Sequence, residues 1–184
     1  VSALYPRIPG YVLEFGVASV YTINMLAGFF REKTIYGFDS FDGLPEDWVK
    51  NPGRIDFPKG FFKGSLPEVR HNVVLISGLF QNVLPTWLKK NPDAVSYLHI
   101  DSDLYSSARY VLNVLNDRIK PGTVVVFNEL CRWDEKTSDG FKGEYANWQE
   151  GEWKALKEWM IENNRTIKIL CRDNAESAVI VVCK

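Results

Sequence analysis

Cysteine is scarce in this sequence. Cys131, Cys171 and Cys183 are the three cysteines among 184 residues, and they lie far apart or in unrelated patterns. This number and spacing exclude a scaffold built on disulfides and a cysteine-rich zinc site. Cys183 falls in the last apolar run, where we expect it to be a small buried hydrophobic residue. On these grounds we expect a cytoplasmic protein.

A large excess of either charge is also absent. The 22 Lys and Arg residues nearly balance 23 Asp and Glu residues, for a net charge of -1. The chain therefore has no electrostatic basis for binding nucleic acid or an anionic membrane. No apolar run approaches the length of a membrane span, and residues 1–10 do not have the pattern of a signal peptide. We expect neither nucleic acid nor a membrane as a partner.

Short apolar runs alternate with helical patterns along the chain, without an internal repeat or an interdomain linker. Five runs are compact and nearly unbroken in apolar character, which is typical of strands buried on both faces of a parallel sheet. They are residues 11–15, 34–38, 72–76, 95–100 and 123–127. This alternation predicts one domain over residues 1–184, with five βα units.

Two amphipathic segments predict helices. Residues 106–122 have apolar side chains at helical spacing as far as Ile119, and Pro121 and Gly122 predict the end of that helix. Residues 150–164 show a similar pattern with a second apolar face.

The end of the chain departs from the alternation. Residues 166–171 and 177–183 are apolar and separated only by the turn-like RDNAE, so we expect an antiparallel hairpin. The predicted fold is therefore α/β and Rossmann-like, with a doubly wound, seven-stranded, mostly parallel sheet and an antiparallel strand from the hairpin. A dinucleotide-binding Rossmann domain normally has six parallel strands, so the hairpin favours a different subclass.

Glycine is scarce where a phosphate-binding loop would need it. The stretch VLEFGVASVYTI, residues 12–23, predicts a strand, a turn at Gly16 and the start of a helix. A pyrophosphate requires several glycines in such a turn, so NAD is disfavoured. The carboxylate of Glu14 suits an ammonium group instead. Backbone N–H groups near Ala18 and Ser19 suit a carboxylate of the ligand.

Polar side chains follow all five expected parallel strands, and the carboxyl ends of such strands form the ligand-binding edge of a sheet. The residues at these ends are Glu14 and Gly16, Asp39, Ser77 and Gly78, Asp101 and Asp103, and Asn128 and Glu129. Acids near helix N-termini are stabilised by the helix dipole, and this explanation stays open for each position alone. Four carboxylate-bearing ends together favour a cationic, hydroxyl-bearing ligand, because clustered like charges are costly to bury.

S-adenosylmethionine has these properties: a sulfonium, an ammonium, a carboxylate and a ribose, with no phosphate. Asp39 follows Gly16 by about 20 residues, the usual spacing of an acid that binds a ribose. NAD also offers a ribose, so Asp39 alone does not separate the two cofactors.

Several segments together resemble the macrocin O-methyltransferase family of class I S-adenosylmethionine-dependent enzymes, some of which act on sugar hydroxyls. The segments are EFGVASVYTI, YGFDSFDGLPEDW, ISGLFQNVLP, HIDSDLYSS, FNEL and GEYANWQEGEWKALKEW. The resemblance extends from about residue 10 to the C-terminus and implies the class I methyltransferase fold. It implies that Glu14, Gly16 and Ser19 bind the methionine part, that Asp39 binds the ribose beside Ser40 and Phe41, and that Gly78, Leu79 and Phe80 border the adenine.

The resemblance also implies a divalent metal, usually Mg²⁺, bound by the acid after the fourth strand and an acidic pair after the fifth. These positions are Asp101, Asn128 and Glu129. The family normally has an aspartate at the position of Asn128, and a neutral amide is a weaker ligand for magnesium. Metal-assisted and metal-free chemistry are therefore both open. We expect Asp101 to act as the base and as a metal ligand, with Glu129 as its catalytic partner.

The family usually carries a helical segment before the first strand, whereas here that strand begins near residue 11. We therefore expect a more open site, a larger acceptor, or a cover supplied by the second subunit of a homodimer. The acceptor is expected to contact the aromatic segment 131–150, with Trp133, Phe141, Tyr145 and Trp148, and also Trp48. These aromatic residues could equally cap the hydrophobic surface beneath the loop, which would be a structural role. His99, two residues before Asp101, is expected to be a hydrogen-bonded core residue.

Three functions follow in order of preference. The first is an O-methyltransferase that transfers a methyl group from S-adenosylmethionine to a sugar-type or phenolic hydroxyl of a small molecule. The second is a module that binds the cofactor but has lost catalysis, which Asn128 suggests. The third is an NAD-dependent oxidoreductase, which the missing glycines and the terminal hairpin disfavour.

Overall fold

The computed structural model describes residues 5–130, 132–133, 141–142, 145–172 and 177–184. Its main feature is a seven-stranded sheet with the order β3-β2-β1-β4-β5-β9-β8. The strands are β1 (Tyr11–Phe15), β2 (Ile35–Asp39), β3 (Val73–Ser77), β4 (Val95–Ile100), β5 (Ile119–Phe127), β8 (Ile167–Arg172) and β9 (Ala178–Val182). The neighbouring strands β3, β2, β1, β4 and β5 pair parallel with one another in this order. Strand β9 pairs antiparallel with both β5 and β8. The predicted doubly wound sheet and its terminal hairpin are confirmed.

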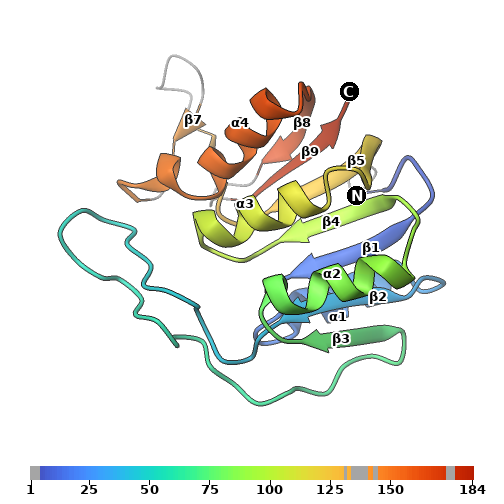
Figure 1. The fold of residues 1–184 in the computed structure, drawn as a ribbon, viewed down its shortest axis with the longest axis horizontal. Coiled ribbons are helices and arrows are strands. Elements are labelled where there is room, and N and C mark those ends of the chain that lie inside the picture. Colours follow the sequence, from blue (N-terminus) through green and yellow to red (C-terminus); the bar gives the residue numbers. More distant parts are fainter. Residues whose placement is uncertain (1–4, 131, 134–140, 143–144, 173–176) are drawn as a thin grey trace.

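Helices cover both faces of this sheet. They are α1 (Tyr21–Phe29), α2 (Phe80–Lys90), α3 (Tyr105–Val114) and α4 (Glu152–Glu162), the last preceded by the 3-10 turn η2 (Trp148–Glu150). Helices α2, α3 and α4 lie on one face and α1 lies on the other (Figure 1). None of the described helices combines the length and apolar character that a bilayer crossing requires. Two short strands, β6 (Arg132–Trp133) and β7 (Phe141–Lys142), pair separately.

The alternation of side chains along β1 divides the core into two layers. Leu13 and Phe15 pack with the α2–α4 layer, and Phe15 stacks on Phe38 of β2 with ring centroids 4.6 Å apart. Val12 packs with the α1 layer. Glycine at position 37 of β2 lets α1 approach the sheet, because a Cβ there would lie 2.3 Å from Cδ1 of Ile23.

Two expected elements differ from the observed ones. No helix joins β2 to β3, so the expected five βα units are wrong at this point. The connection spans residues 40–72 and contains four prolines and four glycines, which interrupt helical hydrogen bonding. In Figure 1 this segment extends from the ends of the parallel strands as a long irregular chain. We call it the 40–72 segment.

The second difference concerns the helix expected over residues 106–122, which ends at Val114. Ile119 instead begins β5 and pairs with Val95. The irregular start of β5 is stabilised by Thr123, whose Oγ1 accepts the N–H of Lys120 at 3.0 Å and donates to the carbonyl of Val95 at 2.7 Å. The helix was predicted to be too long because Ile119 continues the apolar spacing of the helix. An apolar residue at this position fits a buried strand equally well.

Cys183 is exposed, so its expected burial is wrong. Strand β9 ends at Val182, and only the backbone N–H of Cys183 continues the pairing, by donating to the carbonyl of Thr166 at 2.8 Å. Cys171 is also exposed, and Cys131 lies outside the described residues.

Candidate active site

A cavity opens at the carboxyl ends of β1, β2, β3 and β4. Seven of the residues predicted to bind the cofactor line it: Gly16, Ala18, Asp39, Ser40, Leu79, Phe80 and Asp101. The strands bring these residues together from four separate parts of the chain, as expected for a parallel sheet. The 40–72 segment adds further lining residues that the sequence did not indicate: Gly43, Leu44, Pro45 and Phe62.

Gly16 lies where the ends of β1 and β4 approach most closely. Its φ is +89°, and a Cβ at this position would lie 1.8 Å from the carbonyl oxygen of Asp101. The N–H of Gly16 donates to the carbonyl of Phe38 at 3.0 Å, and the N–H of Asp101 donates to that of Phe15 at 2.8 Å. A single glycine therefore allows the chain to turn while the backbone of Asp101 stays close to the loop after β1.

Asp39 holds the loop after β1. Its Oδ2 accepts the N–H groups of Val17 at 2.8 Å and Ala18 at 2.9 Å, and its Oδ1 accepts that of Phe41 at 2.7 Å. The N–H of Ala18, which we expected to face a ligand carboxylate, therefore donates to Asp39 instead. Helix α1 begins only at Tyr21, so the turn between Gly16 and α1 is longer than expected.

Glu14 does not line the cavity, although the sequence suggested that it binds the ligand. Its carboxylate is fully buried on the α1 side of the sheet, and His99 Nδ1 lies 3.3 Å from Oε2. The contact has ion-pair distance but lacks hydrogen-bond geometry, so neither Glu14 oxygen has a hydrogen-bond partner among the described residues. Burial raises the pKa of Glu14, and the neighbouring His99 opposes that shift. His99 is a core residue, as expected, but without the expected hydrogen bond at Nδ1.

Three further predicted residues also lie outside the cavity lining. Ser19 is exposed, Phe41 packs in the core layer beneath α1, and Gly78 donates its N–H to the carbonyl of Asp39 at 2.9 Å. Phe41 and Gly78 thus border the residues that form the wall.

Asp101 and Asp103 follow β4 and both line the cavity. Burial raises the pKa of both carboxyl groups. For Asp101, the charge of His99 and a hydrogen bond with Asn128 oppose the shift. For Asp103, the charge of Asp101 adds to burial and Lys50 opposes it, and the resulting pKa is about 7. Asp103 is therefore poised to exchange a proton near neutral pH, a property the sequence did not single out.

Glu152, at the start of α4, joins the ends of two strands. It is fully buried, and its carboxylate accepts the N–H of Ser102 at 3.4 Å and the N–H of Glu129 at 3.1 Å. Burial raises its pKa well above the ordinary value of glutamate. The sequence places an acid in the first turn of a helix here, and only the tertiary structure shows that it fixes the ends of β4 and β5.

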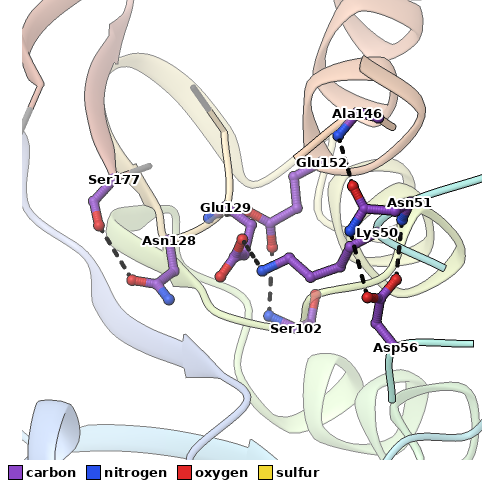
Figure 2. Close-up of polar contacts among 9 residues, drawn as sticks. All are labelled: Lys50, Asn51, Asp56, Ser102, Asn128, Glu129, Ala146, Glu152 and Ser177. Atoms are coloured by element: carbon purple, nitrogen blue, oxygen red, sulfur yellow. Dashed lines mark hydrogen bonds and ion pairs between the residues drawn. The ribbon is translucent and has the colours of Figure 1, made fainter. Parts of the chain in front are cut away.

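The residues expected to hold magnesium do not fit that role. Asn128 Oδ1, the atom that would face a cation, accepts a hydrogen bond from Ser177 Oγ at 3.2 Å. Glu129 Oε2 lies 3.4 Å from Nζ of Lys50 (Figure 2). Within the part of the chain that is described, no group of three or more His, Cys, Asp or Glu side chains is arranged to hold a metal ion. The expected magnesium site is therefore not supported.

A second cavity lies beside the first. The 40–72 segment, the start of α3 and the chain before α4 form its walls. Trp48 and Tyr145, both expected near the acceptor, line it, while Trp148 packs on Trp153 with ring centroids 5.5 Å apart. Among the described residues, Asp103 alone lines both cavities. The side chains of Trp133 and Phe141 lie outside the described part of the structure.

Solved structures with this fold include several methyltransferases. CalS11, a calicheamicin methyltransferase, matches with a TM-score of 0.68 and 22% identity over 95% of this chain and 72% of its own. The O-methyltransferase NovP matches with a TM-score of 0.66 and 18% identity over 97% and 74%. Fibrillarin from Aeropyrum pernix, solved with bound S-adenosyl-L-methionine, matches with a TM-score of 0.52 and 16% identity over 94% and 66%. At these identities the likeness shows the fold.

A family model described as a methyltransferase domain matches residues 13–130. No curated protein matches the sequence. The family match includes Gly16, Asp39, Asp101 and Glu129, and it spans more than half of the 184 residues. The chain therefore belongs to the methyltransferase domain family and has the fold of the class I S-adenosylmethionine-dependent enzymes.

Proposed function

We propose that this chain is an O-methyltransferase that uses S-adenosylmethionine to methylate a hydroxyl group of a small molecule. One observation carries the proposal. The cavity at the strand ends is lined by the carboxylates of Asp39, Asp101 and Asp103, and by no Lys or Arg among the described residues. Such a site favours a sulfonium cation and disfavours a pyrophosphate, which would need cationic or N–H donors.

The walls of the cavity suit the parts of this cofactor. Asp39 uses three of its roughly four acceptor sites for backbone N–H groups, which leaves capacity for a ribose hydroxyl. Leu79 and Phe80 offer apolar surface for the adenine, and the backbone at Gly16 is open to the methionine part. These are the positions that the resemblance to the macrocin family assigns to the same roles.

The reaction is an in-line displacement. The acceptor oxygen forms a bond to the methyl carbon, the bond between carbon and sulfur breaks, and the electron pair passes to sulfur. Holding the oxygen behind the methyl group supplies roughly 7–11 kcal/mol of the barrier. The hydroxyl proton passes to a carboxylate: Asp101 faces the cofactor cavity, and Asp103 faces both cavities. We assign the acceptor to the second cavity, so Asp103 joins Asp101 as a candidate base.

A sugar-type hydroxyl is the preferred acceptor. The support is the resemblance to the macrocin family and the likeness in fold to CalS11, which is described as a TDP-rhamnose 3'-O-methyltransferase. Trp48 and Tyr145 give the second cavity an apolar wall against which a sugar ring can pack. A phenolic acceptor would pack against the same wall and is the other outcome of the test.

Two measurements test the proposal. Isothermal calorimetry with adenosylhomocysteine should show one site, and Asp39→Ala should weaken it. Turnover of labelled S-adenosylmethionine should then appear with nucleotide-linked sugars and not with phenols. Cofactor binding without turnover on either panel would favour a binding module instead. A wild-type protein that binds NADH but not adenosylhomocysteine would contradict the proposal.

A further inference from the structure

We propose that the ammonium of Lys50 takes the place of a divalent cation in this active site, so that methyl transfer here needs no metal. The inference rests on the proposed function for its catalytic meaning. Its structural part, that a lysine occupies the cation position, stands on the contacts described below and is tested separately.

The first contact places Lys50 on Glu129, one of the residues expected to bind a metal. Its Nζ lies 3.4 Å from Oε2 of Glu129, and its charge also acts on Asp103. The side chains of Lys50 and Glu129 are only 21% and 13% exposed, so water screens the pair weakly. Glu129 is in turn held by Glu152 through its backbone N–H. Figure 2 shows Lys50 entering this group from the 40–72 segment.

The second contact concerns Asn128. Its side-chain oxygen accepts a hydrogen bond from Ser177 Oγ at 3.2 Å. That oxygen is the atom of an asparagine that could bind a cation. At this position Asn128 therefore turns its oxygen to Ser177, where the family's usual aspartate would present an oxygen to a cation.

The surroundings of the ammonium fit a lysine and not magnesium. Nζ lies 4.2 Å from the ring centroid of Trp48 and 4.6 Å from that of Tyr145. Aromatic faces stabilise an ammonium through cation–π attraction. Magnesium requires near-octahedral oxygen ligands, and these faces supply none. Two sides of the position are thus closed to a metal and favourable to Lys50.

Lys50 is a positioning residue in this scheme. Its single charge holds the Glu129 carboxylate and offsets the negative charge around Asp103. The same 40–72 segment lines the cofactor cavity through Gly43, Leu44 and Pro45. The cation and one wall of the cofactor site are therefore delivered by one stretch of chain.

The test uses Mn²⁺ as a paramagnetic probe of the cation position in the full chain. Free Mn²⁺ is followed by electron paramagnetic resonance during titration with wild type and with Lys50→Met/Asn128→Asp. The double variant removes the ammonium, keeps an apolar side chain against Trp48 and Tyr145, and restores a carboxylate. We expect at least about tenfold tighter Mn²⁺ binding by the double variant than by wild type. Equal binding by the two proteins would overturn the inference.

Lys63→Met is the matched control. Lys63 belongs to the same segment and pairs with Asp42 at 3.1 Å, but both side chains are mostly exposed. The Lys63→Met variant should bind Mn²⁺ and turn over substrate as wild type does. If Lys63→Met gained as much Mn²⁺ binding as the double variant, the inference would be overturned. Circular dichroism verifies that each variant is folded. Should the double variant not fold, Asn128→Asp alone, with Lys50 still in place, should bind Mn²⁺ no better than wild type.

Activity gives an independent readout. A chelator should leave the turnover of wild type unchanged. The Lys50→Met variant should lose about tenfold or more in kcat. Added Mn²⁺ should restore part of the turnover in the double variant and not in Lys50→Met. Chelator-sensitive wild-type turnover would overturn the inference. A wild type that fails to bind adenosylhomocysteine would instead remove the proposed function, and the Mn²⁺ titration would still decide which cation the site accepts.

Discussion

Oδ2 of Asp39, at the end of β2, accepts the backbone N–H of Ala18 at 2.9 Å across the mouth of the cofactor cavity. Ala18 has a φ of +40°, and Val20 has a φ of +61°, so the loop after β1 is held in a conformation that side-chain-bearing residues seldom adopt. Asp39 thus shapes the loop before any ligand arrives, in addition to the role we propose for it with the ribose.

Replacing Asp39 with asparagine should weaken adenosylhomocysteine binding by at least about tenfold, or ~1.4 kcal/mol. An amide has one acceptor oxygen, so it cannot accept from the loop and from Phe41 at once, and it is a poorer partner for ribose hydroxyls. Calorimetry measures the affinity. Asp42→Asn, at an exposed acid nearby, should leave it unchanged; equal losses in the two variants would contradict this prediction.

Gly37→Ala should destabilise the fold by about 1–3 kcal/mol, the usual cost of overpacking. The new Cβ would lie 2.3 Å from Ile23 Cδ1 and 2.9 Å from Val17 Cγ2, so these side chains would have to shift within the packed layer beneath α1. Urea unfolding measures the change. Gly64→Ala is the control, because its Cβ would meet nothing within 4 Å. A Gly37→Ala protein as stable as the control would show that α1 tolerates the shift.

The rate of methyl transfer should rise with pH until about pH 7 and then level. Burial, and next the charge of Asp101, raise the pKa of Asp103 to about 7, and a base must be ionised to accept a proton. The rising limb of kcat/KM should be lost in Asp103→Asn. It should move to higher pH in Lys50→Met, because Lys50 lowers the pKa of Asp103. A limb that stays in place in Asp103→Asn would assign it to another group.

Glu152→Ala should destabilise the fold more than Glu152→Gln. Alanine leaves the buried N–H groups of Ser102 and Glu129 without their acceptor, at about 1–3 kcal/mol each, whereas glutamine keeps one oxygen. Thermal and urea unfolding measure the difference. Glu150→Ala, at the exposed partner of Lys154, serves as the control. Comparable stability of the two Glu152 variants would show that another group satisfies these donors.

The sheet was predictable because each strand is marked locally, by an unbroken apolar run and a polar residue after it. Gly16, Asp39 and Asp101 were predictable for the same reason, since parallel topology brings strand ends to one edge. The end of α3 was not, because Ile119 is apolar in either assignment and only its pairing with Val95 decides.

Lys50 and Glu152 were beyond the reach of sequence patterns. Each acts on strand ends far away in the chain, Lys50 on Glu129 and Glu152 on Ser102 and Glu129. Nothing in the local spacing of either residue signals that contact. The orientation of Glu14 was not predictable either: it lies near the end of an apolar run, but strand alternation turns its side chain toward the α1 layer and His99. Its binding of the ligand stays a prediction.

The irregular 40–72 segment contributes both to the folded core and to the lining of the two cavities. The sheet and its helices supply most of the core, and the 40–72 segment adds Phe41, Leu44 and Trp48 to it. The same segment lines both cavities and carries Lys50. With the acceptor in the second cavity, as proposed, exchanges of the exposed residues of this segment are expected to change acceptor preference. Grafting those residues between homologues would test this expectation.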